Sequence, residues 1–166
     1  MDSVENKRIL DALIEADVDF VVIGGVAIVL HGVDYHTVDI DFAIEHSVET
    51  AQRIADAMAP YHPRPLGFPP DLPYVWDKTM VLNTSNLVME SDIGRFDLLS
   101  EPAGVDSYAN LRSRAIEFPL FGHMIKVASI DDLIEMKRAA GRDKDLEHIR
   151  HLDAVKRVLA ESDEPA

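Results

Sequence analysis

Cysteine is absent from this chain of 166 residues, which excludes disulfide bonds and thiolate metal sites. No apolar run approaches the roughly 20 residues that a membrane-spanning helix needs. The N-terminus also lacks the basic segment and apolar block of a signal peptide. These absences predict a cytoplasmic protein with no membrane partner.

Basic residues are scarce: 16 Lys and Arg stand against 30 Asp and Glu, for a formal net charge of −14. Such a balance argues against a broad surface for sequence-independent nucleic-acid binding, because that binding depends on cationic side chains. The acidic excess lies mainly before Lys126, with 8 basic and 20 acidic residues, against 8 and 10 from Lys126 onward. A nucleic-acid partner would therefore have to dock locally.

The pattern of apolar residues predicts an α/β (α+β) fold, with helices packed on a mixed β-sheet and a helical C-terminal end. We expect one domain over residues 1–166, with a sheet core at 1–125, a strand and helices at 126–160 and a tail at 161–166. The expected elements are helices at 4–16, 24–30, 48–59, 107–114, 130–140 and 142–160, and strands at 20–23, 38–45, 79–83, 87–90, 94–99, 115–121 and 123–129.

Six prolines fall within residues 60–73, a density that excludes regular structure there on sequence grounds. This segment is interpreted either as a lid over a ligand or as a passive connector.

The chemistry of the chain is expected in the stretch IGGVAIVLHGVDYHTVDIDF, from Ile23 to Phe42. Two glycines follow an apolar strand and open a helix, an arrangement that offers backbone N–H groups to a phosphate. Alternation along the next strand places Asp39 and Asp41 on one face, while Val38, Ile40 and Phe42 point into the core. Adjacent carboxylates repel each other, and a hard cation such as Mg²⁺ relieves that repulsion.

Two later features support this reading. Asp97 lies between apolar residues of a separate strand, where a lone carboxylate is costly without a role. A basic segment from Lys137 to Lys144 also provides cations that suit phosphate oxygens. This basic segment also has two purely structural interpretations. Lys137 would lie on a solvated helix face, and Arg142, Lys144 and Asp145 would form a surface ion-pair group.

The motifs IGGVAIVLHG, HTVDIDF, RFDLL and VASIDDLIEMKRAAGRDKDLEHI together resemble the DNA polymerase β-like nucleotidyltransferase superfamily. The resemblance spans about residues 18–152 and is closest to the small bacterial branch that includes AbiEii/MenT-type toxins. It implies transfer of a nucleoside monophosphate (NMP) from an NTP to an acceptor. The acceptor would be the 3′ end of tRNA for a toxin with an antitoxin partner, or a small molecule for an antibiotic-modifying enzyme.

The resemblance also implies roles for individual residues. Asp39, Asp41 and Asp97 would bind two Mg²⁺ ions, or Mn²⁺, and Asp97 would help deprotonate the acceptor hydroxyl. The implied nucleotide-binding residues are Gly24, Gly25, Thr37, Lys137, Arg142 and Lys144.

One departure from the family pattern concerns the stretch before the acids. The family has an Arg ahead of the Thr, and no Arg lies between Gly25 and Asp39 here, although His36 is adjacent to Thr37. Two readings follow: His36 replaces that cation, or the chain is a binding module that has lost turnover. Outside this stretch, His148 and His151 are interpreted as solvent-facing residues of a helix.

Overall fold

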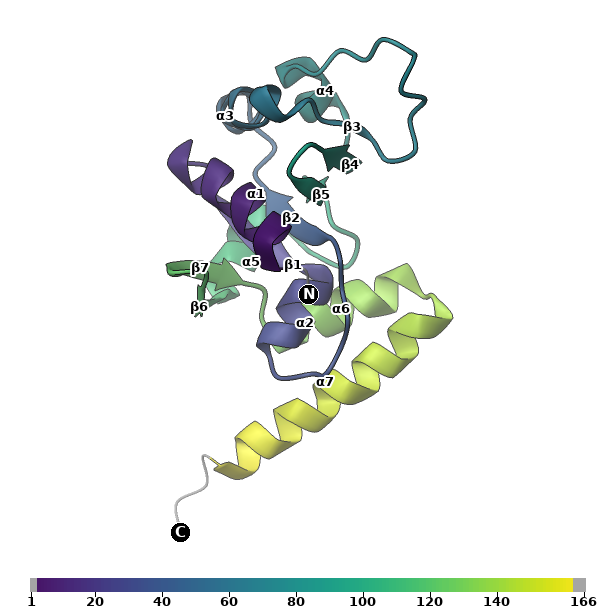
Figure 1. Ribbon diagram of the computed structural model, residues 1–166. Coiled ribbons are helices and arrows are strands. Elements are labelled where there is room, and N and C mark those ends of the chain that lie inside the picture. The colour runs from purple at the N-terminus through teal and green to yellow at the C-terminus, as the bar shows by residue number, and fades with distance from the viewer. Residues whose placement is uncertain (1–2, 163–166) are drawn as a thin grey trace.

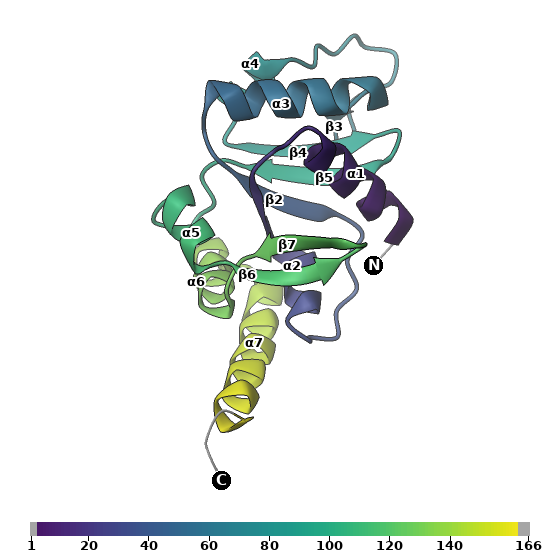
Figure 2. The ribbon, with the colours of Figure 1, turned by 90° about the vertical axis from the view of Figure 1, so that its left-hand side faces the viewer.

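The computed structural model describes residues 3–162 and contains one seven-stranded mixed sheet flanked by helices (Figures 1 and 2). Its strands are β1 (Phe20–Ile23), β2 (Ile40–Ile44), β3 (Arg64–Pro65), β4 (Asn86–Ser91), β5 (Gly94–Leu99), β6 (Ile116–Leu120) and β7 (His123–Val127). Its helices are α1 (Ser3–Glu15), α2 (Gly24–Leu30), α3 (Val48–Met58), α4 (Lys78–Asn83), α5 (Tyr108–Arg114), α6 (Ile130–Ala140) and α7 (Asp143–Ser162), with a 3-10 turn, η1, at Ala59–Tyr61. The expected α/β class with a helical C-terminal end is confirmed.

The strands lie in the order β3-β4-β5-β2-β1-β7-β6. β2 runs parallel to β5 and β1 runs parallel to β7, whereas the other neighbouring pairs are antiparallel. Asp41 of β2 is paired with Ile23 of β1 on one side and with Asp97 of β5 on the other. The register therefore brings the glycine pair after β1 and two of the expected acids to one place in the sheet.

The apolar core fixes this register from the opposite face of the sheet. Phe42 and Phe96 are fully buried, and the Phe42 ring meets Phe20 edge to face at 5.0 Å. Burial of one such side chain stabilises a fold by about 1.5–3 kcal/mol, so a one-residue slip of β2 would expose its core residues and bury Asp41 among apolar groups. Helix α1 packs on β5 and against α3, while α2 packs on β1 and β2 and contacts α6.

Side-chain caps define where the helices begin. Ser129 Oγ accepts a hydrogen bond from the backbone N–H of Asp132 at 3.1 Å, and Ser47 and Ser107 cap α3 and α5 in the same way. Gly141 ends α6 in the left-handed region, with φ of 63°, and allows α7 to leave in a new direction. Both ribbon views show α7 running away from the sheet toward the C-terminus (Figures 1 and 2).

Two expectations about the middle of the chain are wrong. Residues 79–83 form most of α4 and not a strand, because Asp77 accepts a hydrogen bond from the backbone N–H of Met80 and starts a helix. The proline-rich segment contains η1 and the two-residue strand β3. A proline is tolerated in β3 because this strand lies at the edge of the sheet.

The beginning of β2 also differs from the prediction. The strand starts at Ile40, so Asp39 immediately precedes it. Val38 is 46% exposed and does not point into the core. The chain turns from a loop into the strand at this point, which brings Asp39 and Asp41 near each other without strict alternation.

Two elements in the C-terminal part cross the boundaries expected from the sequence. The division at residue 126 falls inside β7, whose last residue is Val127. Helix α7 continues through Ser162, two residues into the expected tail, and residues 163–166 lie outside the described part of the chain. None of the helices within residues 3–162 combines the length and hydrophobicity needed to cross a lipid bilayer.

Candidate active site

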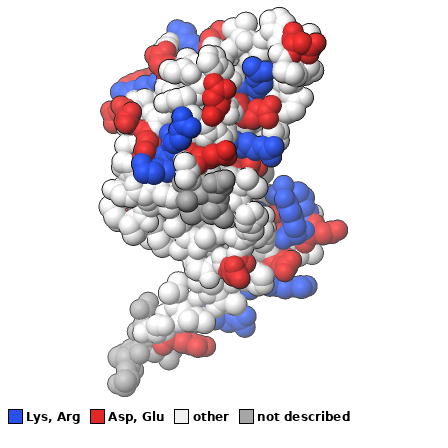
Figure 3. Space-filling model, viewed as in Figure 1, with Lys and Arg blue, Asp and Glu red and all other residues white. Residues whose placement is uncertain are grey.

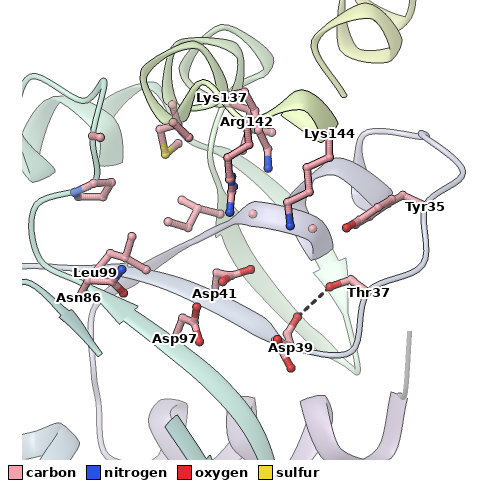
Figure 4. A pocket seen from close by; sticks show the side chains of 18 residues that line it. Tyr35, Thr37, Asp39, Asp41, Asn86, Asp97, Leu99, Lys137, Arg142 and Lys144 are labelled. Atoms are coloured by element: carbon pink, nitrogen blue, oxygen red, sulfur yellow. Dashed lines mark hydrogen bonds between the residues drawn. The ribbon is translucent and has the colours of Figure 1, made fainter. Parts of the chain in front are cut away.

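A cavity of about 560 Å³ opens where β1 ends and where β2 and β5 carry their carboxylates (Figure 4). Asp41 and Asp97 occupy directly opposite positions of two neighbouring strands, so their side chains project from the same face of the sheet. Asp39 enters from the loop before β2. All three carboxylates line the cavity.

The two glycines are required by close approach of the acid-bearing strand and its preceding loop. Gly24 has a φ of 65°, and a Cβ on it would lie 2.1 Å from Asp41 Oδ2. A Cβ on Gly25 would lie 2.6 Å from Thr37 Oγ1. The absent side chains therefore leave the backbone of the β1–α2 junction open to the cavity, right beside Asp41.

The loop carrying Asp39 is fixed by a local hydrogen bond. Thr37 Oγ1 donates to the backbone carbonyl of Asp39 at 3.2 Å. One carboxylate oxygen of Asp39, Oδ1, is buried and has no hydrogen-bond partner among the described residues. A buried carboxylate oxygen is costly to leave unpaired, which identifies Asp39 as a group that fits a further, cationic partner.

Electrostatics of the other two acids lead to the same conclusion. Burial raises the pKa of Asp41 to about 7, and the adjacent Asp97 and Asp39 carboxylates add to this rise. Burial and the charge of Asp39 also raise the pKa of Asp97. Three carboxylates in one cavity therefore resist full ionisation at neutral pH unless a cation joins them.

Three basic side chains face the acids across the cavity: Lys137 from α6, Arg142 from the α6–α7 junction and Lys144 from the first turn of α7 (Figure 4). Lys137 is largely buried, with 12% of its side chain exposed. Cations opposite carboxylates, with space between them, form a site suited to a ligand that carries both phosphate groups and metal ions.

Asp145 holds two of these cations in place. It is only 1% exposed, and it pairs with Lys137 Nζ at 3.2 Å and with Arg142 Nε at 2.8 Å. Burial alone raises the pKa of Asp145, but hydrogen bonds from Arg142 and Lys137 outweigh it and hold the pKa below its ordinary value. The alternative of a surface ion-pair group is therefore wrong for Asp145, because this carboxylate is buried behind the cavity.

No pattern in the sequence indicated that Tyr35 and His148 belong to the site. Tyr35 lines the cavity beside Gly25, and the His148 ring packs edge to face against it at 4.4 Å. His148 is 6% exposed, so its expected solvent-facing position is wrong, whereas His151 is exposed. Burial and nearby Lys137 lower the pKa of His148. His36 is exposed and is not among the cavity residues.

A family model described as a nucleotidyltransferase of unknown function (DUF6036) matches residues 7–162. The chain belongs to this family. No curated protein sequence matches the chain.

Among solved structures, the chain is similar to an antigenic nucleotidyltransferase-like protein from Paracoccidioides brasiliensis, known from a crystal structure. The TM-score is 0.55 at 18% sequence identity, and the match covers 95% of this chain and 77% of the other. At this identity the similarity shows a nucleotidyltransferase-like fold. Neither finding names the AbiEii/MenT-type branch, so membership in the nucleotidyltransferase family is the level that they support.

The nine residues assigned metal-binding or nucleotide-binding roles from the sequence all line the same cavity. The arrangement fits divalent cations through its acids: an orphaned oxygen on Asp39, raised pKa values for Asp41 and Asp97, and a ligand set made of carboxylates. Within residues 3–162 no three His, Cys, Asp or Glu side chains converge closely enough to complete a metal site by themselves. A divalent cation at these carboxylates would therefore need further ligands, such as waters or substrate phosphates.

Proposed function

We propose that this protein transfers the NMP unit of an NTP to a hydroxyl acceptor and releases pyrophosphate, with divalent metal ions bound by Asp39, Asp41 and Asp97. The observation that carries the proposal is the placement of three carboxylates opposite three cations, beside a glycine pair without side chains, in one cavity. Membership in the nucleotidyltransferase family supports it.

In this proposal, each part of the cavity performs one task. The backbone at Gly24 and Gly25 receives the terminal phosphates, with Thr37 beside them, and Lys137, Arg142 and Lys144 neutralise phosphate oxygens. Bound Mg²⁺ would supply charge neutralisation at the phosphates and lower the pKa of the attacking hydroxyl. Mn²⁺ has similar ligand preferences and would substitute for it.

The reaction is a single in-line displacement. The acceptor oxygen attacks the α-phosphorus, a new P–O bond forms, and the bond between the α-phosphorus and the oxygen bridging to the β-phosphate breaks. Pyrophosphate leaves with that electron pair, and the hydroxyl proton passes to the carboxylate of Asp97. Catalysis then rests on positioning and charge stabilisation, since no residue forms a covalent bond to the substrate.

The acceptor implied by the resemblance is the 3′ end of tRNA, which would make the protein a toxin with an antitoxin partner. An antibiotic-modifying transferase is the alternative. The reading as a binding module without turnover is disfavoured, because all three acids and three cations line the cavity despite the missing Arg before Thr37. The cations of α6 and α7 supply the charge that this Arg would bring.

The test is incubation with each labelled NTP, Mg²⁺, and either total tRNA or candidate antibiotics. We expect label transfer in the wild-type protein and a loss of at least about 100-fold in Asp39→Ala and Asp41→Ala. Asp34→Ala is the matched control, because Asp34 is exposed on the same loop and is not a cavity residue. Full activity in either acid variant contradicts the assignment of these carboxylates.

A further inference from the structure

The cavity extends in one direction from the acids to the glycine pair and on to Tyr35. Asp41 lies opposite Asp97 in the sheet, and a Cβ on Gly24 would lie 2.1 Å from Asp41 Oδ2. A Cβ on the next residue, Gly25, would lie 3.1 Å from Tyr35 Cε1, the ring carbon adjacent to the one that carries the hydroxyl group. Tyr35 therefore presents its hydroxyl end beside the glycine pair, at the end of the cavity away from Asp97.

Lys144 faces this hydroxyl from the first turn of α7. Both side chains line the cavity, and they point toward one another in Figure 4. Within residues 3–162 the Tyr35 hydroxyl makes no hydrogen bond and Lys144 forms no salt bridge. Lys137 and Arg142, in contrast, both pair with Asp145. A hydroxyl and an ammonium group that lack acceptors and share one space form a place for an anion.

His148 holds the Tyr35 ring on its other side. The two rings meet edge to face, with centroids 4.4 Å apart and planes at 77°, a geometry that aromatic pairs prefer. Nδ1 of His148 is buried and has no hydrogen-bond partner in the described part of the chain. Burial lowers the pKa of His148, and the charges of Lys137 and Lys144 add to this decrease. The imidazole is therefore neutral at pH 7, and it contributes a packed ring and no charge.

The direction of the cavity decides which part of a nucleotide reaches Tyr35 and Lys144. Under the proposed function, the α-phosphorus lies at the three carboxylates, where the displacement takes place. The phosphates that follow it lie along Gly24 and Gly25, and the last phosphate of a triphosphate reaches the two unpaired donors. A diphosphate with its α-phosphorus in the same position ends before them.

We infer that Tyr35 and Lys144 bind the terminal phosphate of the nucleotide, and that His148 positions Tyr35 for this contact. The site then selects a triphosphate over a diphosphate, because only the triphosphate reaches both donors. This inference rests on the proposed function and names the residues of the same site that select the donor nucleotide. Tyr35 determines specificity by touching the phosphate, and His148 is a positioning residue that acts through Tyr35.

The first experiment measures the Kd of Mg²⁺–NTP and of Mg²⁺–NDP by calorimetry without an acceptor. We expect the wild-type protein to bind the NTP at least about 30-fold more tightly than the NDP of the same base. Tyr35→Phe should lower this preference about tenfold, as for a lost hydrogen bond worth about 1.4 kcal/mol, with the Kd for Mg²⁺–NDP unchanged. Lys144→Met should lower the same preference. Tyr61→Phe is the matched control, because Tyr61 is also partly buried and lies outside the cavity.

Two results of this experiment overturn the inference. One is a preference for NTP that Tyr35→Phe or Lys144→Met leaves unchanged. The other is an equal loss of affinity for NTP and NDP in Tyr35→Phe, which would mean that Tyr35 contacts the nucleoside and not the terminal phosphate.

The second experiment tests the positioning role of His148 with the same two titrations. His148→Phe keeps a buried ring against Tyr35 and should retain the wild-type preference, whereas His148→Ala removes the ring and should lower the preference toward that of Tyr35→Phe. Should His148→Ala not fold, His148→Leu, which keeps the position filled and apolar, takes its place. His151→Ala, exposed on the same helix and outside the cavity, is the control. A preference that survives loss of the ring at residue 148 overturns the positioning role.

Failure of this inference and failure of the proposed function give different results. Label transfer from NTP by the wild-type protein, with a preference that Tyr35→Phe does not change, overturns the inference alone. A lowered preference in Tyr35→Phe, with no transfer to any acceptor, overturns the proposed function alone. Absence of NTP binding in the wild-type protein overturns both.

Discussion

At the scale of single residues, Asp41 is held in a position that opposes its own ionisation. It is paired in register with Asp97, pressed against Gly24, and its pKa is raised to about 7 by burial and by the neighbouring carboxylates. A buried carboxyl whose pKa is raised destabilises the folded protein when it is ionised. This gives a test that does not depend on knowing the substrate.

Without divalent cations, the wild-type protein should lose stability relative to Asp41→Asn as pH rises. A carboxyl whose pKa is raised from 3.8 to about 7 binds its proton more tightly in the folded state, so its stabilising effect fades between those two values. Urea unfolding with a chelator should show near-equal free energies of unfolding at pH 4, and at pH 8 an advantage of about 2–4 kcal/mol for the variant. Asp34→Asn should follow the wild-type curve, and parallel curves for all three proteins would contradict the strain at Asp41.

Asp145 offers a second residue-scale prediction because it positions cations without lining the cavity. Asp145→Asn should raise the Kd for Mg²⁺–NTP about tenfold and lower stability by about 1–3 kcal/mol, since two cations lose their buried partner. Calorimetry below the unfolding temperature measures the first effect and urea unfolding the second. Asp143→Asn, with an exposed carboxylate two residues earlier, is the control. Lost stability with unchanged NTP affinity would show that Asp145 serves only the fold.

At the scale of elements, the loop after β5 depends on a close approach to α6. Gly104 has a φ of 83°, and a Cβ on it would lie 2.5 Å from the backbone oxygen of Glu135. The neighbouring Pro102 and Ala103 line the cavity, so this approach also shapes the cavity wall.

Gly104→Ala should therefore lower the free energy of unfolding by more than the unfavourable φ alone would. Gly122 has a φ of 87° with open space around it, which makes Gly122→Ala the matched control for the backbone effect. We expect Gly122→Ala to lower the free energy of unfolding by about 1–2 kcal/mol and Gly104→Ala to lower it by about 1–3 kcal/mol more. The difference arises because the methyl group added at Gly104 meets backbone that cannot rotate away. Equal losses in urea unfolding would show that the contact with α6 is easily relieved.

Elements with clear local signals could be predicted from the sequence, and those set by distant contacts could not. The apolar run of β1 and the glycine pair that opens α2 each predicted an element that the structure confirms. The β-branched and apolar residues of α4 favour a strand, but the N-cap at Asp77 starts a helix there. β3 exists only because β4 lies beside it, a pairing that no local pattern in a proline-rich segment reveals.

The candidate site shows the same division. Its acids, glycines and cations follow short-range patterns in the sequence, and the structure places them around one cavity. Tyr35, Asn86 and His148 carry no such pattern, since their places depend on how a loop, an edge-side strand and α7 meet in space. Asp145 looked like a surface residue because its neighbours are charged, although the two cations it binds enclose it.

At the scale of the whole molecule, charge and shape limit how a large ligand could approach. The face in Figure 3 carries acidic and basic side chains side by side and no broad basic area. The net charge of −14 disfavours extended contact with a phosphate backbone. An RNA acceptor would therefore have to engage locally, through its last nucleotides.

Anchoring of α7 to the rest of the molecule is also uneven along its length. Leu152 is fully buried, whereas Leu159 is 52% exposed on the part of the helix that runs away from the sheet (Figure 1). Leu152→Ala should lower stability by about 2–4 kcal/mol, and Leu159→Ala by less than about 0.5 kcal/mol. Thermal and urea unfolding of both variants measure the contrast. Similar losses would mean that the distal turns of α7 pack on a surface, such as that of another copy.

The most direct measurement of the central claim is calorimetric titration of each NTP in the presence and absence of Mg²⁺, with the wild-type protein, Asp41→Asn and Asp34→Asn. We expect at least one NTP to bind the wild-type protein and Asp34→Asn tightly only when Mg²⁺ is present. Asp41→Asn should lose this dependence, because the carboxylate that resists ionisation in the folded protein is the one that the cation relieves. Binding that is equal in all three proteins, or that is indifferent to Mg²⁺, would contradict a metal-assisted nucleotide site in this cavity.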